Sequence, residues 1–218
     1  KTKVDNRKVH KIVQKMFGKD YFTAPINKLV GLVKGSLVDE NDVNAISHLI
    51  DKYDIKFDSR REENQAIKAI PQILSRCKAE TGTIDFDDMI WLPIANNYPL
   101  PHYDILFVDE AQDFNEVQRE LIARVVNGGR CIIVGDKNQA IYGFRGADSD
   151  SIAMFRKRLE NHSDRNITEL PLTISWRCPQ SVVKEANRYV AEFSCHDDAE
   201  EGTVTVNGAF TPTKNDMV

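Results

Sequence analysis

The sequence predicts an α/β protein in which a parallel sheet with flanking helices follows an all-helical subdomain. Three observations support this fold class. Apolar residues recur at helical spacing through residues 1–80, two continuous apolar runs follow at residues 105–108 and 131–134, and a helical pattern separates those runs. Short, continuously apolar runs are typical of buried parallel strands, and their alternation with helices is typical of a layered α/β domain.

Composition limits the classes of function. The chain has 218 residues, of which 41% are hydrophobic, so it can fill one large domain or two small ones. A formal net charge of −4 gives no global basic signal for nucleic acid, so any contact with DNA has to be local. Neither a secretory signal nor a bilayer-spanning apolar run is present, and by default we expect an intracellular, cytoplasmic location.

The four cysteines are Cys77, Cys131, Cys178 and Cys195, and no two of them have the close spacing of zinc ligands. We therefore expect reduced thiols that mostly lie in the core. Cys195 and His196 are adjacent, but two ligands are too few for a tetrahedral metal site.

The first predicted helix has one apolar and one basic face. The apolar residues are Val9, Ile12, Val13, Met16 and Phe17, and the basic residues are Arg7, Lys8, Lys11 and Lys15. The basic face is expected either to contact DNA phosphates or to be solvated.

Three more apolar stripes complete the helical part. A short second helix is expected around residues 29–33, a third over 43–53 behind an acidic start at residues 39–42, and a fourth over 67–77. Pro71 predicts a kink or a helix start in the fourth.

After Gly82 the pattern changes to alternating strands and helices. Thr83 or Asp85 is expected to cap a short helix that passes Trp91 and ends near Pro93. The elements expected next are a strand at 105–108, a helix at 115–126, a strand at 131–134, a helix from 148 or 149, a strand at 167–172, a helix from Pro179 to about 193 and a strand at 204–206.

Acidic residues follow both apolar runs. Asp109 and Glu110 come directly after the first run, and Asp136 follows the second. Such residues can simply cap the next turn. However, the carboxyl ends of parallel strands form the ligand crevice, where one carboxylate can hold Mg²⁺ and another can activate water. Asp109 is the candidate metal ligand and Glu110 the candidate base.

Three segments together resemble motifs II, III and IV of superfamily 1 helicases: residues 108–113, residues 133–147 and residues 172–179. The extension from Tyr142 to Ala147 resembles the UvrD/Rep branch, whose members move 3′ to 5′ on single-stranded DNA. This resemblance covers residues 83–193 well. It implies a partial RecA-like sheet, with a helical insertion at 1–82, the second half of the first motor domain at 83–172 and an incomplete second motor domain at 173–218.

The resemblance implies ATP and Mg²⁺ as cofactors and single-stranded DNA or a duplex junction as partner. Asp109 would hold Mg²⁺, Glu110 would activate water, and Gln139 would sense the γ-phosphate. Trp176 would stack near adenine, and Arg177 would contact the γ-phosphate. Tyr142 and Phe144 would lie on the DNA side, and Arg145 would link them to motif II.

The sequence departs from the family pattern in two places. Residues 175–178 read Ser-Trp-Arg-Cys where the family usually has Asn-Tyr-Arg-Ser, which puts the adenine contact in doubt. No phosphate loop is found, because Gly18-Lys19 is followed by Asp20 and lacks the earlier glycine. Motifs V and VI are not recognisable either. We therefore expect an internal fragment of a helicase, inactive alone and missing parts at both ends. The alternatives are a non-catalytic DNA- or partner-binding module and an NTPase switch that does not unwind DNA.

Overall fold

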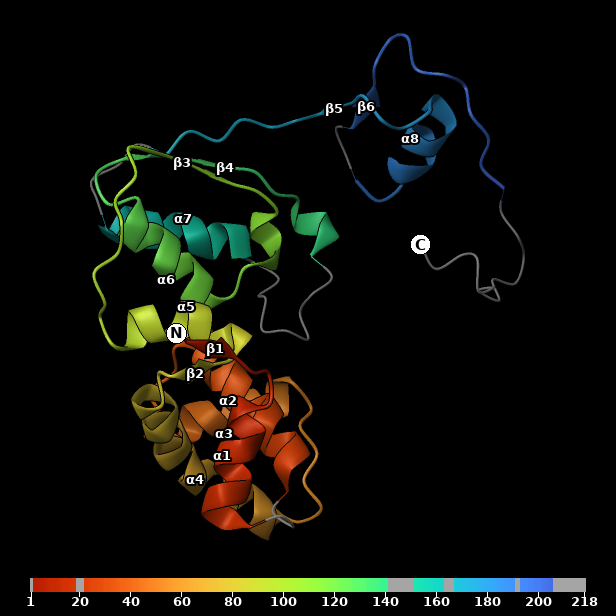
Figure 1. The fold of residues 1–218 in the computed structure, drawn as a ribbon. Coiled ribbons are helices and arrows are strands. Elements are labelled where there is room, and N and C mark those ends of the chain that lie inside the picture. Colours follow the sequence, from red (N-terminus) through yellow and green to blue (C-terminus); the bar gives the residue numbers. More distant parts are fainter. Residues whose placement is uncertain (1, 19–21, 141–150, 163–166, 191–192, 206–218) are drawn as a thin grey trace. The chain divides into compact units, whose positions relative to one another are not determined.

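The computed structural model describes residues 2–18, 22–140, 151–162, 167–190 and 193–205 (Figure 1). The chain forms two compact units, Lys1–Ile167 and Thr168–Val218. It is a mixed α/β protein, mostly helical, with small parallel sheets. The predicted fold class is confirmed. No helix in these ranges is long and apolar enough to cross a membrane.

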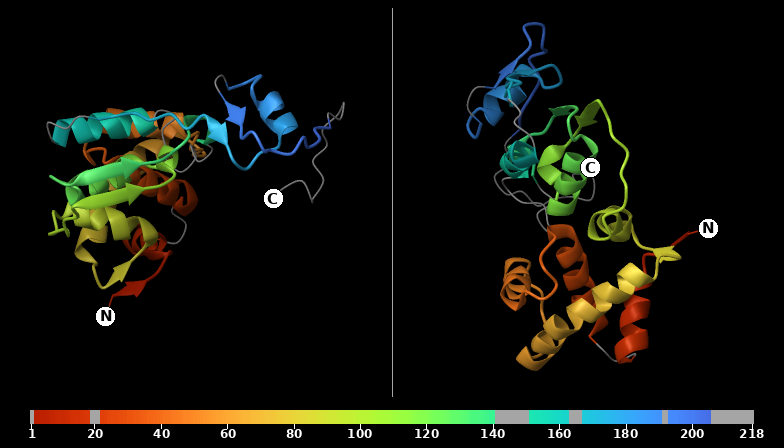
Figure 2. Two further views of the ribbon diagram at one scale, coloured as in Figure 1. Left: turned by 90° about the horizontal axis from the view of Figure 1, so that it is seen from above. Right: turned by 90° about the vertical axis from the view of Figure 1, so that its left-hand side faces the viewer.

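The amino-terminal part of the first unit is helical, as predicted (Figures 1 and 2). Its helices are α1 (Lys8–Phe17), α2 (Thr23–Ser36), α3 (Val43–Lys52) and α4 (Arg60–Ala79). Their apolar stripes form one core, in which Val13, Leu29 and Ile73 are completely buried. Burying each such side chain contributes about 1.5–3 kcal/mol, so this core holds the helices together.

Two helices begin or extend differently from expectation. Helix α2 is longer than the short helix expected around residues 29–33. Helix α4 begins at Arg60, behind Ser59, whose hydroxyl accepts a hydrogen bond from Glu62 N at 3.3 Å. Pro71 lies inside α4, so of the two alternatives expected for it, a kink or a helix start, the helix start is wrong. The Ser59 cap sets the start of α4 instead.

Lys8 corrects the predicted basic face of α1. It is 2% exposed, and its Nζ lies 2.6 Å from Asp88 Oδ2. Lys34 of α2 is fully buried beside it and binds both Asp85 and Asp88, at 2.9 and 2.8 Å. Lys8 is therefore neither solvated nor available to a phosphate, because a buried carboxylate requires its charge.

Two short segments join the helical part to the rest of the first unit. Strand β1 (Lys3–Val4) pairs in parallel with β2 (Thr83–Ile84), and neither strand was expected. Helix α5 (Phe86–Ala95) follows, with Asp85 and Asp88 forming a capping box. Asp85 was expected as a cap, and the helix ends close to Pro93, as expected.

The second part of the unit contains the predicted parallel pair. Strand β3 (Ile105–Val108) lies beside β4 (Arg130–Ile133) in register from Ile105 opposite Arg130 to Val108 opposite Ile133. Helix α6 (Glu116–Val125) connects them, behind its N-cap Asn115. Helix α7 (Ser151–His162) packs on α6, and Phe155 is completely buried in the core between them and the strands. The predicted helix starts at 148 or 149 lie outside the described residues.

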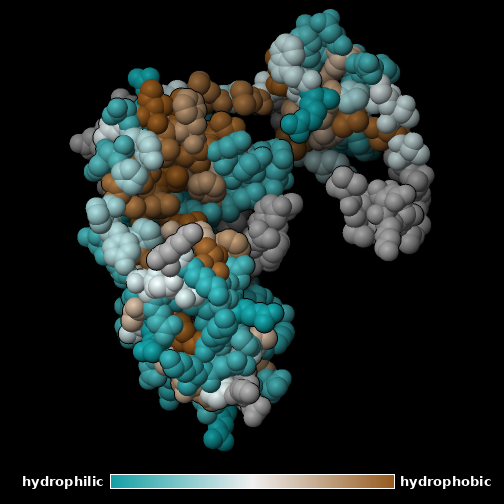
Figure 3. Space-filling model, viewed as in Figure 1, coloured by the Kyte–Doolittle hydropathy of each residue, from teal (hydrophilic) through white to brown (hydrophobic). Residues whose placement is uncertain are grey.

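Burial of the strands on both faces was expected and is not observed within the described ranges. One face of the strand pair packs, through Val108 and Ile133, on the core that contains Phe155. On the other face Ile105 and Phe107 are 53% and 73% exposed, and Ile132 and Val134 are also exposed. Figure 3 shows apolar residues gathered over this part of the molecule. In the described part of the chain this sheet has two strands, and helices pack on one of its faces.

The second unit holds β5 (Ile174–Ser175), α8 (Gln180–Ala186) and β6 (Ser194–Cys195), with β5 and β6 parallel. The expected strand at 167–172 is wrong, because these residues have no regular structure, and Leu170 and Leu172 are 79% and 85% exposed. Helix α8 follows Pro179 but ends well before residue 193. No strand forms at 204–205, and residue 206 lies outside the described part.

Candidate active site

The parallel register brings the carboxyl ends of β3 and β4 to one edge. Val134 N donates to Val108 O at 2.8 Å, and Ala111 N donates to Val134 O at 3.0 Å. The acidic segments after the two strands therefore leave the same edge of the sheet. This is the position at which parallel sheets bind their ligands.

Asp109 is exposed at the end of β3. Its Oδ1 accepts a hydrogen bond from Glu110 N at 2.9 Å. Oδ2 has no hydrogen bond in the part of the chain that the structure describes, so it is available to a cation. A free carboxylate oxygen is a suitable ligand for Mg²⁺, which usually takes one or two carboxylates together with phosphate oxygens and water.

Glu110 adopts a left-handed backbone conformation, with φ 52° and ψ 41°. This conformation is uncommon for a residue with a side chain and costs about 1–3 kcal/mol. It turns the chain from β3 into the short 3₁₀ helix η1 (Ala111–Asp113). Because the turn is this tight, the exposed Glu110 side chain stays at the sheet edge beside Asp109.

Gln112 connects the two acidic segments, and sequence reasoning gave it no role. It is 3% exposed; its Nε2 donates to Glu110 Oε2 at 2.6 Å, and its Oε1 accepts from Asp136 N at 3.0 Å. A buried amide with both ends bonded holds its partners in one arrangement. The signal in the sequence that could have identified Gln112 was its position two residues after Glu110, across a tight turn.

Asp136 and Gln139 lie on the loop after β4. Asp136 caps the 3₁₀ helix η2 (Lys137–Gln139), accepting from Asn138 N at 2.9 Å. Its Oδ2 accepts from Gln139 Nε2 at 2.8 Å. The capping alternative thus describes Asp136 well, and Gln139 is held on the same loop.

Gly135 allows the two segments to approach closely. A Cβ atom at this position would lie 2.7 Å from Gln112 Oε1, 3.2 Å from Ala111 N and 3.2 Å from Ile152 Cδ1. The first distance is closer than Cβ atoms come to other atoms, so a side chain here would displace the Gln112 amide. Glycine at this position keeps the Glu110–Gln112–Asp136 connection intact.

Trp176 and Arg177 belong to the second unit and are both exposed. Trp176 is 78% exposed, and its ring lies against the His196 ring, with centroids 3.7 Å apart and the two planes tilted by 32°. Ser175 Oγ accepts hydrogen bonds from the backbone N–H groups of Arg177 and Cys178, at 3.4 and 3.0 Å, and so holds the turn that follows β5. The sequence did not indicate that His196 is a contact partner of Trp176.

The structure brings together Asp109, Glu110 and Gln139 at one sheet edge, with Gln112 and Asp136 between them. It does not relate them to Trp176 and Arg177, which lie in the other unit. Tyr142, Phe144 and Arg145 fall outside the described residues. Within the described ranges, no group of three or more His, Cys, Asp or Glu side chains is placed to hold a metal ion. Mg²⁺ at Asp109 would therefore depend on oxygen ligands from a nucleotide and water.

The family model of the UvrD/REP helicase N-terminal domain matches residues 2–160. ATP-dependent DNA helicase PcrA of Staphylococcus epidermidis is 30% identical over 128 residues, which cover 53% of this chain and 18% of that protein. PcrA of Staphylococcus aureus is 26% identical over 179 residues, 76% of this chain and 24% of that protein. The chain thus spans a quarter or less of these relatives.

Proposed function

The chain belongs to the UvrD/REP helicase family, and from this membership we propose that it forms part of a motor that couples ATP hydrolysis to 3′–5′ movement on single-stranded DNA. One observation supports the proposal most directly. Asp109 and Glu110 stand at the carboxyl end of β3, and Gln112 ties Glu110 to the loop that follows β4. A metal ligand and a base held side by side are what nucleotide hydrolysis requires.

In this proposal each residue at the sheet edge has one task. Asp109 would hold Mg²⁺, and Glu110 would accept a proton from the attacking water. Gln139 responds to the γ-phosphate from the loop after β4. When bound, Mg²⁺ would neutralise charge on the phosphates and so favour attack on the terminal one.

The proposal extends to five residues outside this cluster. Trp176 would stack on the adenine base, and Arg177 would stabilise charge on the γ-phosphate. Tyr142 and Phe144 would stack on DNA bases, and Arg145 would connect them to the segment after β3. Exposed aromatic rings suit stacking because every base has a flat face, and the exposed ring of Trp176 supports this assignment. An intracellular location is part of the same proposal, since the substrate is DNA.

The test begins with the reading frame that encodes this chain. We expect codons for a Gly-rich phosphate loop before Lys1, and DNA-stimulated ATPase and unwinding activity from the whole encoded protein. The 218-residue chain alone is expected to hydrolyse no ATP, because its sequence has no phosphate loop to present the nucleotide.

Other outcomes would replace the proposal. DNA binding by a whole protein without a phosphate loop would favour a non-catalytic binding module. ATP hydrolysis without unwinding or translocation would favour a switch. Glu110-dependent hydrolysis by the isolated chain would show that the nucleotide site is organised differently.

A further inference from the structure

The indole of Trp176 has an aromatic partner, the imidazole of His196. The two ring centroids lie 3.7 Å apart, and the ring planes are tilted by 32°. Trp176 directly follows β5 and His196 directly follows β6, and these strands pair in parallel with Ser175 opposite Cys195 (Figure 1). The residues that come next on the two strands therefore lie side by side, so the strand register brings the two rings together.

His196 is the fixed member of this pair. Its backbone N–H donates to Ser175 O, and its C=O accepts from Ala199 N, both at 3.0 Å. The ring is bonded too, because Asp198 N donates to Nδ1 at 3.2 Å. The side chain is only 28% exposed. Turning the ring away would break the hydrogen bond at Nδ1, so His196 provides a stationary surface.

Trp176 is the open member of the pair. Its main chain lies in the turn after β5, where Ser175 Oγ accepts hydrogen bonds from the N–H groups of Arg177 and Cys178. Those hydrogen bonds fix the backbone, but they do not restrain rotation of the indole about its side-chain bonds. The contact with His196 restrains this rotation, while Trp176 as a whole stays 78% exposed.

A histidine against an exposed tryptophan can either support the indole or occupy the place of a ligand that stacks on it. A placeholder has to leave when the ligand arrives, and the hydrogen bonds of His196 oppose its departure. A support stays in place and leaves the rest of the indole uncovered, which is the arrangement observed. The geometry therefore favours support.

We propose that His196 is a positioning residue, which holds the Trp176 indole in place to stack on the base of a nucleoside triphosphate. This inference rests on the proposed function, which assigns Trp176 to the base. His196 lies behind the indole and does not touch the nucleotide. A side chain that is already held loses less freedom when a ligand binds, so the ligand binds more tightly. His196 therefore contributes to nucleotide affinity and not to the chemical step.

The experiment measures steady-state ATP hydrolysis by the whole encoded protein. His196→Ala removes the ring, and His196→Phe keeps a flat ring but loses the hydrogen bond at Nδ1. His48→Ala is the matched control, because His48 is an exposed histidine on α3 in the first unit. We expect KM for ATP to rise about three- to tenfold in His196→Ala, the effect of losing one aromatic pair, with kcat unchanged. His196→Phe should keep a KM close to that of the wild type.

Two further readouts distinguish a held indole from a general loss of structure, which lowers kcat and leaves KM unchanged. Inhibition by inorganic triphosphate, which has no base, should be equal in His196→Ala and wild type. The near-ultraviolet circular dichroism lost in His196→Ala should match that lost in Trp176→Ala, because an indole that rotates freely gives little signal. Weaker inhibition by triphosphate, or an unchanged spectrum, in His196→Ala would overturn the inference.

The KM values separate this inference from the proposed function. An unchanged KM in His196→Ala would overturn the inference and leave the proposed function in place. A lower KM would also overturn it, because His196 would then occupy the place of the base. The same holds for a KM in His196→Phe as high as in His196→Ala, since the ring would not matter. Absence of ATP hydrolysis by the wild-type protein would overturn the proposed function, and the inference with it.

Discussion

Gln112 Nε2 donates a 2.6 Å hydrogen bond to Oε2 of Glu110, and the other end of the same buried amide accepts from the Asp136 backbone. The candidate base is therefore held by a residue that also contacts the neighbouring loop. The Gln112 side chain thus fixes the loop after β4 relative to the Glu110 carboxylate.

Replacing Gln112 by Met keeps its volume and removes both hydrogen bonds. We expect turnover in the whole protein to fall about 10- to 100-fold, because a hydrogen bond to a charged group contributes about 1.5–3 kcal/mol. Steady-state kinetics would show the loss in kcat with KM for ATP unchanged. Gln14→Met, in the half-buried part of α1, is the control and should keep normal turnover.

Glu110→Gln separates chemistry from binding. Glutamine has nearly the same shape but cannot accept a proton at neutral pH, so we expect hydrolysis to fall by about 10²- to 10⁴-fold while ATP binding survives. Single-turnover hydrolysis and equilibrium nucleotide binding are the measurements. Asp109→Asn should also weaken the Mg²⁺ dependence, because a neutral oxygen is a poorer ligand for a hard cation. Near-normal hydrolysis by Glu110→Gln would rule out this base.

Phe144→Ala tests the proposed DNA side. We expect weaker binding of single-stranded DNA by about 1–3 kcal/mol, the contribution of one stacked base, with an unchanged melting temperature. Fluorescence anisotropy and thermal unfolding measure the two effects. A stability loss of about 3–5 kcal/mol with normal DNA affinity would instead assign Phe144 to a core.

Lys34→Met tests the buried charges between α2 and α5. Asp85 and Asp88 would each lose an ammonium partner, at 2.9 and 2.8 Å. We expect the free energy of unfolding to fall by about 3–5 kcal/mol. Urea denaturation of the chain measures this change. Lys28→Met is the control on the same helix; Lys28 is exposed and donates one hydrogen bond, to Tyr53 O at 2.9 Å, so the expected change is smaller, about 0.5–1.5 kcal/mol.

Alkaline pH should destabilise the same region. Burial raises the pKa of the Cys77 thiol from 9.0 to about 11. Burial opposes the charge on Lys34, but attraction by Cys77, Asp85 and Asp88 outweighs it and raises its pKa above 10.5. For both groups the folded state retains its proton to higher pH than the unfolded state. Each contribution is therefore complete below the unfolded pKa and is lost as pH rises through the folded value.

Between pH 9 and 11 the thiol accounts for about 2–3 kcal/mol of this loss. Urea denaturation at pH 7, 9 and 11 measures it. Cys77→Val should flatten the decline, whereas Cys195→Ala, in the second unit, should leave it unchanged. An equal decline in wild type and Cys77→Val would exclude the thiol as its source.

Local sequence determined the helices, the two main strands and the place of the acidic pair. Helical spacing indicated the apolar faces of α1 to α4, because residues on one face of a helix recur every few positions in the sequence. Continuous apolar runs indicated β3 and β4, because such a run is also a pattern of residues that are neighbours in sequence. Asp109 and Glu110 follow β3 directly, so their position at the sheet edge required no knowledge of distant residues.

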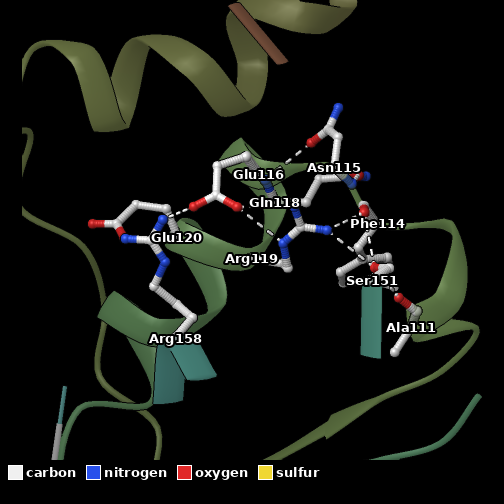
Figure 4. Close-up of polar contacts among 9 residues, drawn as sticks. All are labelled: Ala111, Phe114, Asn115, Glu116, Gln118, Arg119, Glu120, Ser151 and Arg158. Carbon is white, nitrogen blue, oxygen red and sulfur yellow. Dashed lines mark hydrogen bonds and ion pairs between the residues drawn. The ribbon is translucent and has the colours of Figure 1, made fainter. Parts of the chain in front are cut away.

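Tertiary structure alone decided which polar groups meet. Lys8 was expected on a solvated or DNA-binding face, yet its partner Asp88 lies 80 residues away in sequence. Gln112 reaches Asp136 only because β3 and β4 pair in parallel, and Ser151 reaches Ala111 only because α7 packs on α6 (Figure 4). A helical or strand period specifies the face on which a residue lies. The charge or hydrogen-bond partner on that face depends on packing between elements far apart in the chain.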